Sequence, residues 1–115
     1  MAIKEGNITI MVKDMDKSIS FYESIGLTLK NRWGNHYAQL TVPGLTIGLH
    51  PGSSMEQAGK FDNLSIGFTT DNFNETQALL QSLSIETMLR QEEGGSFLHF
   101  ADPDGTPLYF IKPKW

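Results

Sequence analysis

The residues best suited to chemistry in this chain are its three histidines, because it contains no cysteine for a thiol nucleophile, a disulfide or a thiolate metal site. Near neutral pH, an imidazole can act as a general base, exchange hydrogen bonds or bind a metal ion. His99 alternates with Phe97 in a run that reads as a strand, so both side chains point to one face and Leu98 and Phe100 to the other. His99 is therefore either a base or hydrogen-bonding group in a cavity, or a histidine that only fills space there.

The other two histidines have weaker chemical roles. His50 follows Gly48 by two residues and shares its strand face. As a metal ligand it would need a carboxylate at a partner position, and the pattern offers none. His36 opens a strand beside the turn at Trp33 and Gly34, where we expect it to be solvated.

Several aromatic side chains share the strand parity of His99. Tyr37, Phe97 and Tyr109 alternate in phase with a few polar residues, and rings with a few polar groups are typical of a small-molecule site. The alternative is that the rings simply fill the interior, as in a small closed barrel. We expect Trp33, at a loop tip, and Trp115, at the terminus, to be exposed. The predicted ligand-binding residues are Asn7, Tyr37, Gln39, His50, Ser65, Phe97, His99 and Tyr109.

An internal repeat indicates which elements position these residues. Residue types in the first half recur 58 positions later over about twenty residues, without a gap. The aligned pairs include Asn7 with Ser65, Ile8 with Ile66, Ile10 with Phe68, Met15 with Phe73, and Leu27 with Ile85. Residues 37–40 then match 97–100 at an offset of 60. The two halves therefore follow one design.

Each half reads as a strand, a helix and three further strands. Alternating apolar residues predict strands at 7–12, 27–31, 36–42, 45–50, 65–69, 85–90, 96–101 and 107–112. Helices are expected near 17–25 and 74–83, with Asp16 and Asn74 as N-caps, Met15 and Phe73 as hydrophobic staples before them, and Gly26 after the first helix. The second helix should bury Leu79, Leu80 and Leu83.

The order of elements predicts an α+β fold with two βαβββ modules, at about 4–51 and 63–113. A βαβββ module leaves one sheet face open and cannot close a core alone. We therefore expect the two modules to pack side by side as a single domain over 1–115. The segment between them, from Pro51 to about Asp62, is rich in Gly and Ser and reads as a linker.

Three motifs resemble the vicinal oxygen chelate superfamily of glyoxalases, fosfomycin-resistance proteins, extradiol dioxygenases and bleomycin-resistance proteins. They are VKDMDKSISFY at 12–22, IGL at 25–27 and FADPDGTPL at 100–108, and the resemblance covers about 4–113. It implies a glyoxalase-like fold in which the paired modules form a mixed sheet curled around a cup. The resemblance also implies that this cup binds a ligand, and it favours a binding role for the aromatic residues.

The resemblance also indicates where metal-dependent members hold their ligands. They carry a His or Gln at the start of each module's first strand and a Glu near the end of its last strand; the matching positions here are Asn7, Ser65, Gly48 and Tyr109. Amide and hydroxyl oxygens alone hold a divalent transition metal weakly. A neutral phenol would first have to lose a proton, against a pKa of about 10. We therefore predict no metal site and no other cofactor.

The leading hypothesis is a metal-free glyoxalase-like protein that binds a small organic molecule in an aromatic cup, in the manner of bleomycin-resistance proteins. The first alternative is a lyase or dioxygenase-type enzyme of the same superfamily, with His99, His50 or both as acid/base or metal ligand. The second alternative is an interaction scaffold. The sequence assigns neither the ligand nor any catalytic residue.

Charge and hydropathy restrict the partners. Nine Lys and Arg against thirteen Asp and Glu give a net charge of −4, and the basic residues form no stripe that could follow nucleic-acid phosphates. Apolar runs are too short for a membrane span, and the N-terminal residues lack the apolar region of a secretion signal. We expect a cytoplasmic protein. The resemblance implies a homodimer, because members of the superfamily are usually homodimers.

Overall fold

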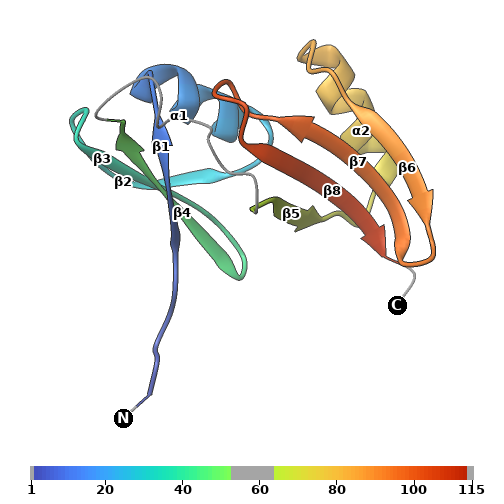
Figure 1. The fold of residues 1–115 in the computed structure, drawn as a ribbon, viewed down its shortest axis with the longest axis horizontal. Coiled ribbons are helices and arrows are strands. Elements are labelled where there is room, and N and C mark those ends of the chain that lie inside the picture. Colours follow the sequence, from blue (N-terminus) through green and yellow to red (C-terminus); the bar gives the residue numbers. More distant parts are fainter. Residues whose placement is uncertain (1, 53–63, 114–115) are drawn as a thin grey trace. The chain divides into compact units, whose positions relative to one another are not determined.

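The computed structural model describes residues 2–52 and 64–113, which divide into two compact units, Met1–Lys60 and Phe61–Trp115 (Figure 1). Unit 1 contains β1 (Ile8–Val12), α1 (Met15–Ser24), β2 (Thr28–Trp33), β3 (Tyr37–Val42) and β4 (Leu45–Pro51). Unit 2 contains β5 (Ile66–Thr69), α2 (Phe73–Ser82), β6 (Met88–Glu92), β7 (Gly95–Ala101) and β8 (Pro107–Pro113). Each unit is a βαβββ module, so the predicted α+β class and repeat are confirmed. That the two units line one cup stays a prediction.

The two sheets have the same topology. The strand order is β1-β4-β3-β2 in unit 1 and β5-β8-β7-β6 in unit 2. In each sheet the first strand pairs in parallel with the last, and the other pairs are antiparallel. The registers place Gly48 between Thr9 and Gln39, and Tyr109 between Gly67 and His99. These rows of aligned residues are where the candidate site forms.

The core of unit 1 lies between its sheet and α1. Strand alternation buries one set of apolar side chains, Ile10, Val12, Ala38, Leu40, Ile47 and Leu49, each at most 1% exposed. From the helix, Met15, Ile19 and Tyr22 are buried with them, at spacings of three and four residues. Since α1 contacts β2, β3 and β4, one face of this sheet is covered and the other face is open.

The helix of unit 2 covers its sheet less completely. Within α2 only Leu80 is buried, so the predicted apolar stripe is wrong for Leu79 and Leu83, which are each 38% exposed. Leu79 lies about 100° around the helix from Leu80, and Leu83 is the C-cap residue beyond the last turn. The strand side chains nevertheless follow the prediction, because Ile66, Phe68, Leu98, Phe100, Leu108 and Phe110 are buried.

Both N-caps lie two residues earlier than predicted, and the helices begin at Met15 and Phe73 rather than at 17 and 74. The N-caps are Asp14 and Asn72, whose side chains accept hydrogen bonds from the backbone N–H of Lys17 (3.1 Å) and Glu75 (3.0 Å). The predicted caps Asp16 and Asn74 lie inside the first turn. Met15 and Phe73, predicted as staples before the caps, are the first helical residues instead.

The helix ends explain why the following strands start late. Gly26 adopts the predicted left-handed conformation (φ 120°), and its repeat partner Ser84 is also left-handed (φ 58°). The next residues, Leu27 and Ile85, donate their N–H groups to helix carbonyls, those of Tyr22 and Leu80, each at 3.0 Å. Because these groups close the helices, the strands begin only afterwards, at Thr28 and Met88. Within the described residues, no helix is long and apolar enough to cross a membrane.

Candidate functional site

The open face of the unit 2 sheet carries a cluster of three rings, which we call the aromatic face: Phe97 and His99 on β7 and Tyr109 on β8. The Phe97 and His99 rings stack with centroids 6.0 Å apart and an interplanar angle of 16°. Tyr109 is tilted against both, with centroids 5.8 Å from Phe97 and 5.7 Å from His99. All three residues are half-buried, so each ring keeps an exposed surface.

A glycine in the neighbouring strand sets the position of Tyr109. Gly67 on β5 lies directly opposite Tyr109 in the parallel register. A Cβ added at Gly67 would overlap Cζ, Cε2 and the hydroxyl oxygen of the tyrosine. The phenol ring therefore lies across the β5 backbone, in space that any other side chain at residue 67 would fill.

The polar atoms of the aromatic face are available for a ligand. Neither the imidazole nitrogens of His99 nor the hydroxyl of Tyr109 makes a hydrogen bond to another residue in the described ranges 2–52 and 64–113. An apolar aromatic surface edged by unpartnered polar groups can stack a planar molecule and fix its orientation.

Unit 1 has a smaller aromatic surface on its own open face. Tyr37 stacks on Trp33 with centroids 5.6 Å apart and an interplanar angle of 26°. The amide nitrogen of Gln39 donates to the Tyr37 hydroxyl (3.4 Å), and its amide oxygen accepts from the side chain of Asn31 (3.2 Å). The Tyr37 ring reaches over Gly48, where an added Cβ would lie 2.9 Å from Cε1 of the tyrosine and 2.8 Å from Oγ1 of Thr9.

The remaining predicted site residues are exposed. His50 is exposed, and its Nδ1 donates to the carbonyl oxygen of Pro51 (2.8 Å). Asn7 and Ser65 are exposed and each precedes the first residue of its strand. His36 is exposed in the turn between β2 and β3, as expected. The structure thus gathers Phe97, His99 and Tyr109 in unit 2, and Tyr37 and Gln39 in unit 1.

The donor groups at these positions do not fit a divalent transition metal. The predicted ligand positions hold Asn7 and Gly48 in unit 1 and Ser65 and Tyr109 in unit 2, and the residues that pair with Gly48 and Tyr109 are Thr9 and Gly67. These amide, hydroxyl and phenol groups and the two glycines provide neither imidazole nor carboxylate. In the part of the chain that the structure describes, no three His, Asp or Glu residues are grouped so that they could hold a metal ion.

Two features of the site were missed from the sequence. Trp33 was expected at a loop tip, but it is the last residue of β2 and stacks on its register partner Tyr37. The short turn before Tyr37 could have indicated this pairing. The sequence around Gly48 and Gly67 does not indicate that they lie under tyrosine rings, because this depends on the side-chain torsions of Tyr37 and Tyr109 on other strands. Trp115 lies outside the described residues.

Comparison with solved structures shows the same fold in several proteins. TnmS3, an antibiotic-binding protein from Streptomyces sp. CB03234, superposes with a TM-score of 0.82 at 24% identity, covering 99% of each chain. The fosfomycin resistance protein FosX from Listeria monocytogenes, in complex with Mn(II) and sulfate, has a TM-score of 0.80 at 20% identity, covering 99% of this chain and 93% of FosX. A glyoxylase/bleomycin resistance protein/dioxygenase domain from Frankia sp. EAN1pec has a TM-score of 0.75 at 20% identity, covering 99% and 98%.

Sequence comparison gives the family. No curated protein matches the chain. The model of the Glyoxalase/Bleomycin resistance protein/Dioxygenase superfamily, however, matches residues 6–110, which include both modules and the residues of both open sheet faces. The chain therefore belongs to the glyoxalase/bleomycin resistance/dioxygenase superfamily.

Proposed function

We propose that this protein binds a small planar organic molecule by stacking it on the aromatic face of unit 2, without a metal ion and without chemical conversion. One observation carries the proposal. The ring centroids of Phe97, His99 and Tyr109 lie within 6.0 Å of one another, and the polar side-chain atoms of His99 and Tyr109 have no hydrogen-bond partner among the described residues. Each ring contact is worth about 0.5–1.5 kcal/mol beyond the area it buries, so two or three contacts add about 1–4.5 kcal/mol to the binding free energy.

The family and the fold agree with a binding role. The superfamily includes bleomycin resistance proteins, and TnmS3, which has the same fold, is an antibiotic-binding protein. FosX was solved with Mn(II), whereas here the facing pairs Thr9 with Gly48 and Gly67 with Tyr109 supply no carboxylate or imidazole. The donor set thus favours sequestration over metal-assisted turnover. Trp33 and Tyr37 offer a second stacking surface in unit 1.

The proposal is tested by titrating the full-length protein, treated with chelator, with the neutral dye N-phenyl-1-naphthylamine, which carries a planar naphthalene ring, and following its fluorescence. Replacing Phe97 or Tyr109 by alanine should weaken dye binding at least about fivefold, since each substitution removes one stacked ring. Phe21→Ala is the matched control, because Phe21 is a half-buried phenylalanine on α1 that contacts Tyr22 instead. Bleomycin can then be added as a candidate competitor.

Two results would contradict the proposal. The first is equal dye affinity of wild type, Phe97→Ala and Tyr109→Ala, which would show that the dye does not bind the aromatic face. The second is about one equivalent of zinc, manganese, iron or nickel in the purified protein that is lost in His99→Ala or His50→Ala. That second result would favour the lyase or dioxygenase alternative.

A further inference from the structure

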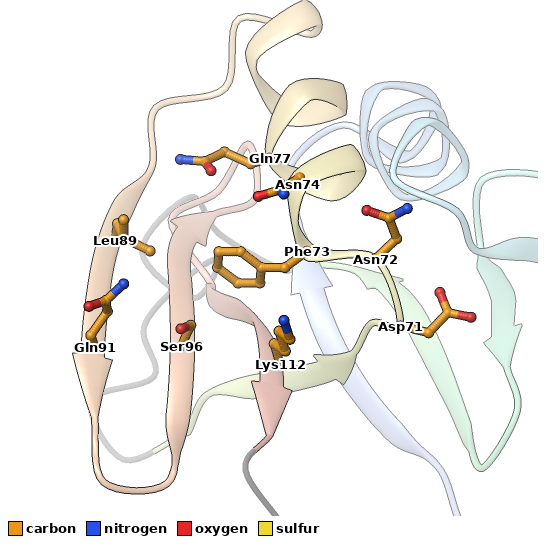
Figure 2. A pocket seen from close by; sticks show the side chains of 9 residues that line it. All are labelled: Asp71, Asn72, Phe73, Asn74, Gln77, Leu89, Gln91, Ser96 and Lys112. Carbon is orange, nitrogen blue, oxygen red and sulfur yellow. The ribbon is translucent and has the colours of Figure 1, made fainter.

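Unit 2 also contains a pocket on the side of its sheet that α2 covers (Figure 2). Its volume is about 490 Å³, within the range of about 300–1,000 Å³ usual for small-ligand sites. It is lined by Asn74 and Gln77 from α2, Leu89 and Gln91 from β6, Ser96 from β7 and Lys112 from β8. Ser96 and Lys112 are register partners whose neighbours Phe97 and Ile111 point to the opposite face. The pocket and the aromatic face therefore lie on opposite sides of the sheet.

The internal repeat explains why the pocket is open. In unit 1, Ile19 is buried (4% exposed) between helix and sheet, and the repeat aligns it with Gln77. In unit 1, an ion pair between Arg32 on the outer strand β2 and Asp16 on α1 (2.6 Å) also connects strand and helix. The equivalent positions in unit 2 hold Leu89 and Asn74, which cannot form an ion pair.

The lining combines one positive charge, on Lys112, and one negative charge, on Asp71, with uncharged polar groups. The ammonium group of Lys112 has no ion pair with any residue that the structure describes. Asn74, Gln77, Gln91 and Ser96 likewise make no side-chain hydrogen bond within residues 2–52 and 64–113. Asp71 lies at the edge of the pocket, and Figure 2 shows its carboxylate pointing away from Lys112. A ligand in this open pocket would thus meet the exposed ammonium group of Lys112 together with hydrogen-bonding amides.

A small part of the pocket lining is apolar. In Figure 2 the ring of Phe73 projects from the start of α2 between the helix and the strands, and Leu89 extends from β6 beside Gln91. An alkyl or aryl chain can pack against these two side chains while its polar end reaches Lys112.

We propose that this pocket is a second binding site, specific for a small organic monocarboxylate. The carboxylate accepts charge-assisted hydrogen bonds from Lys112, with Ser96 and the amides as further donors, and the apolar chain lies on Phe73 and Leu89. A single lysine matches a single negative charge, whereas a dianionic phosphate would keep one charge uncompensated. This site is independent of the stacking surface proposed above.

The test uses the full-length protein and sodium hexanoate as the probe. Hexanoate should shift the side-chain amide NMR signals of Asn74, Gln77 and Gln91 with saturation in the millimolar range. Lys112→Met should weaken binding at least about tenfold, and so should replacing hexanoate by the neutral 1-hexanol. Lys112→Arg should keep the affinity within about threefold, since the guanidinium also binds carboxylates. Lys30→Met, at an exposed lysine of β2, is the matched control and should bind hexanoate as the wild type does.

A double variant tests the origin of the pocket. Asn74→Asp combined with Leu89→Arg introduces into unit 2 the residue types that form the ion pair in unit 1, and it should abolish hexanoate binding while dye binding to the aromatic face is kept. Kept dye binding also shows that the variant folds. The proposal is overturned if hexanoate causes no saturable shift, if 1-hexanol binds as well, or if Lys112→Met binds hexanoate unchanged. Because dye binding and hexanoate binding are measured separately, a result that contradicts one proposal does not contradict the other.

Discussion

At the scale of single residues, two tyrosines on the open sheet faces depend on glycines in the neighbouring strands. Gly48 lies beneath the Tyr37 ring edge and hydroxyl, and Gly67 lies beneath the Tyr109 ring. The glycine is in the last strand of unit 1 but in the first strand of unit 2. Each unit thus removes one side chain from the paired strands so that an aromatic ring can occupy the space.

The first prediction concerns Gly67→Ala. The new methyl group would overlap the Tyr109 ring, so the ring must move, and we expect a loss of about 1–3 kcal/mol in the free energy of unfolding. Chemical denaturation measures this loss, and dye binding should weaken at the same time. Gly6→Ala is the control, because an added Cβ there meets nothing within 4 Å. Equal stability of the two variants would contradict the role assigned to Gly67.

Residue-level prediction from the sequence was accurate only where strand alternation decides the outcome. The period of two placed Phe97 and His99 opposite Leu98 and Phe100, and the structure shows that arrangement. It could not show that Tyr109 lies over Gly67, because that contact depends on the side-chain torsions of a residue 42 positions away. Whether the polar atoms of the aromatic face have hydrogen-bond partners also depends on the folded unit, so the sequence could not predict it.

At the scale of elements, the helix starts show how two polar residues can compete for one role. Asp14 and Asp16 are both of a residue type suited to an N-cap, as are Asn72 and Asn74, and the sequence prediction chose Asp16 and Asn74. The structure selects Asp14 and Asn72, which lie at equivalent repeat positions, and leaves Asp16 to pair with Arg32. The repeat therefore predicted the existence and order of the helices correctly, but their starts only to within two residues.

The second prediction compares the two aspartates. Asp14→Ala removes the acceptor for the Lys17 N–H and should lower the free energy of unfolding by about 1 kcal/mol. Asp16→Asn removes only an ion pair with one largely solvated partner, at 78% side-chain exposure, and should cost less than about 0.5 kcal/mol. Denaturant unfolding of both variants checks the order, and a larger loss for Asp16→Asn would contradict the cap assignment.

The third prediction concerns the left-handed residue after each helix. Ser84 has a φ of 58°, which costs an ordinary side chain about 1–2 kcal/mol, whereas its repeat partner in unit 1 is Gly26. Ser84→Gly should therefore stabilise the protein by about 0.5 kcal/mol after the greater entropy of an unfolded glycine is subtracted.

Gly26→Ala is the reciprocal experiment. An added Cβ there meets nothing within 4 Å, so any loss of stability comes from the backbone at φ 120° alone. Thermal unfolding should show opposite shifts for Ser84→Gly and Gly26→Ala. Shifts of the same sign would contradict the explanation.

At the scale of the whole molecule, the edges of the two sheets differ in how they are protected. The edge strands β2 and β6 carry charged residues, Lys30 and Arg32 in one and Arg90 and Glu92 in the other. Charges on an edge strand oppose pairing with a further strand. The other two edges, β1 and β5, contain no charged residue and no proline.

The fourth prediction follows from these two uncharged edges. Exposed backbone donors and acceptors on a β-branched or aromatic strand favour aggregation, so we expect β1 and β5 to be covered in the assembled protein. We propose that assembly includes a second copy of the chain, and we expect a homodimer at micromolar concentration by sedimentation or light scattering. Met11→Lys and Thr69→Lys each add a charge to one of these edges and should weaken the dimer, whereas a charge added to the already charged β6, as in Gln91→Lys, should not. A clean monomer of the wild type, or a dimer weakened only by Gln91→Lys, would contradict this argument and place any contact between copies at another surface.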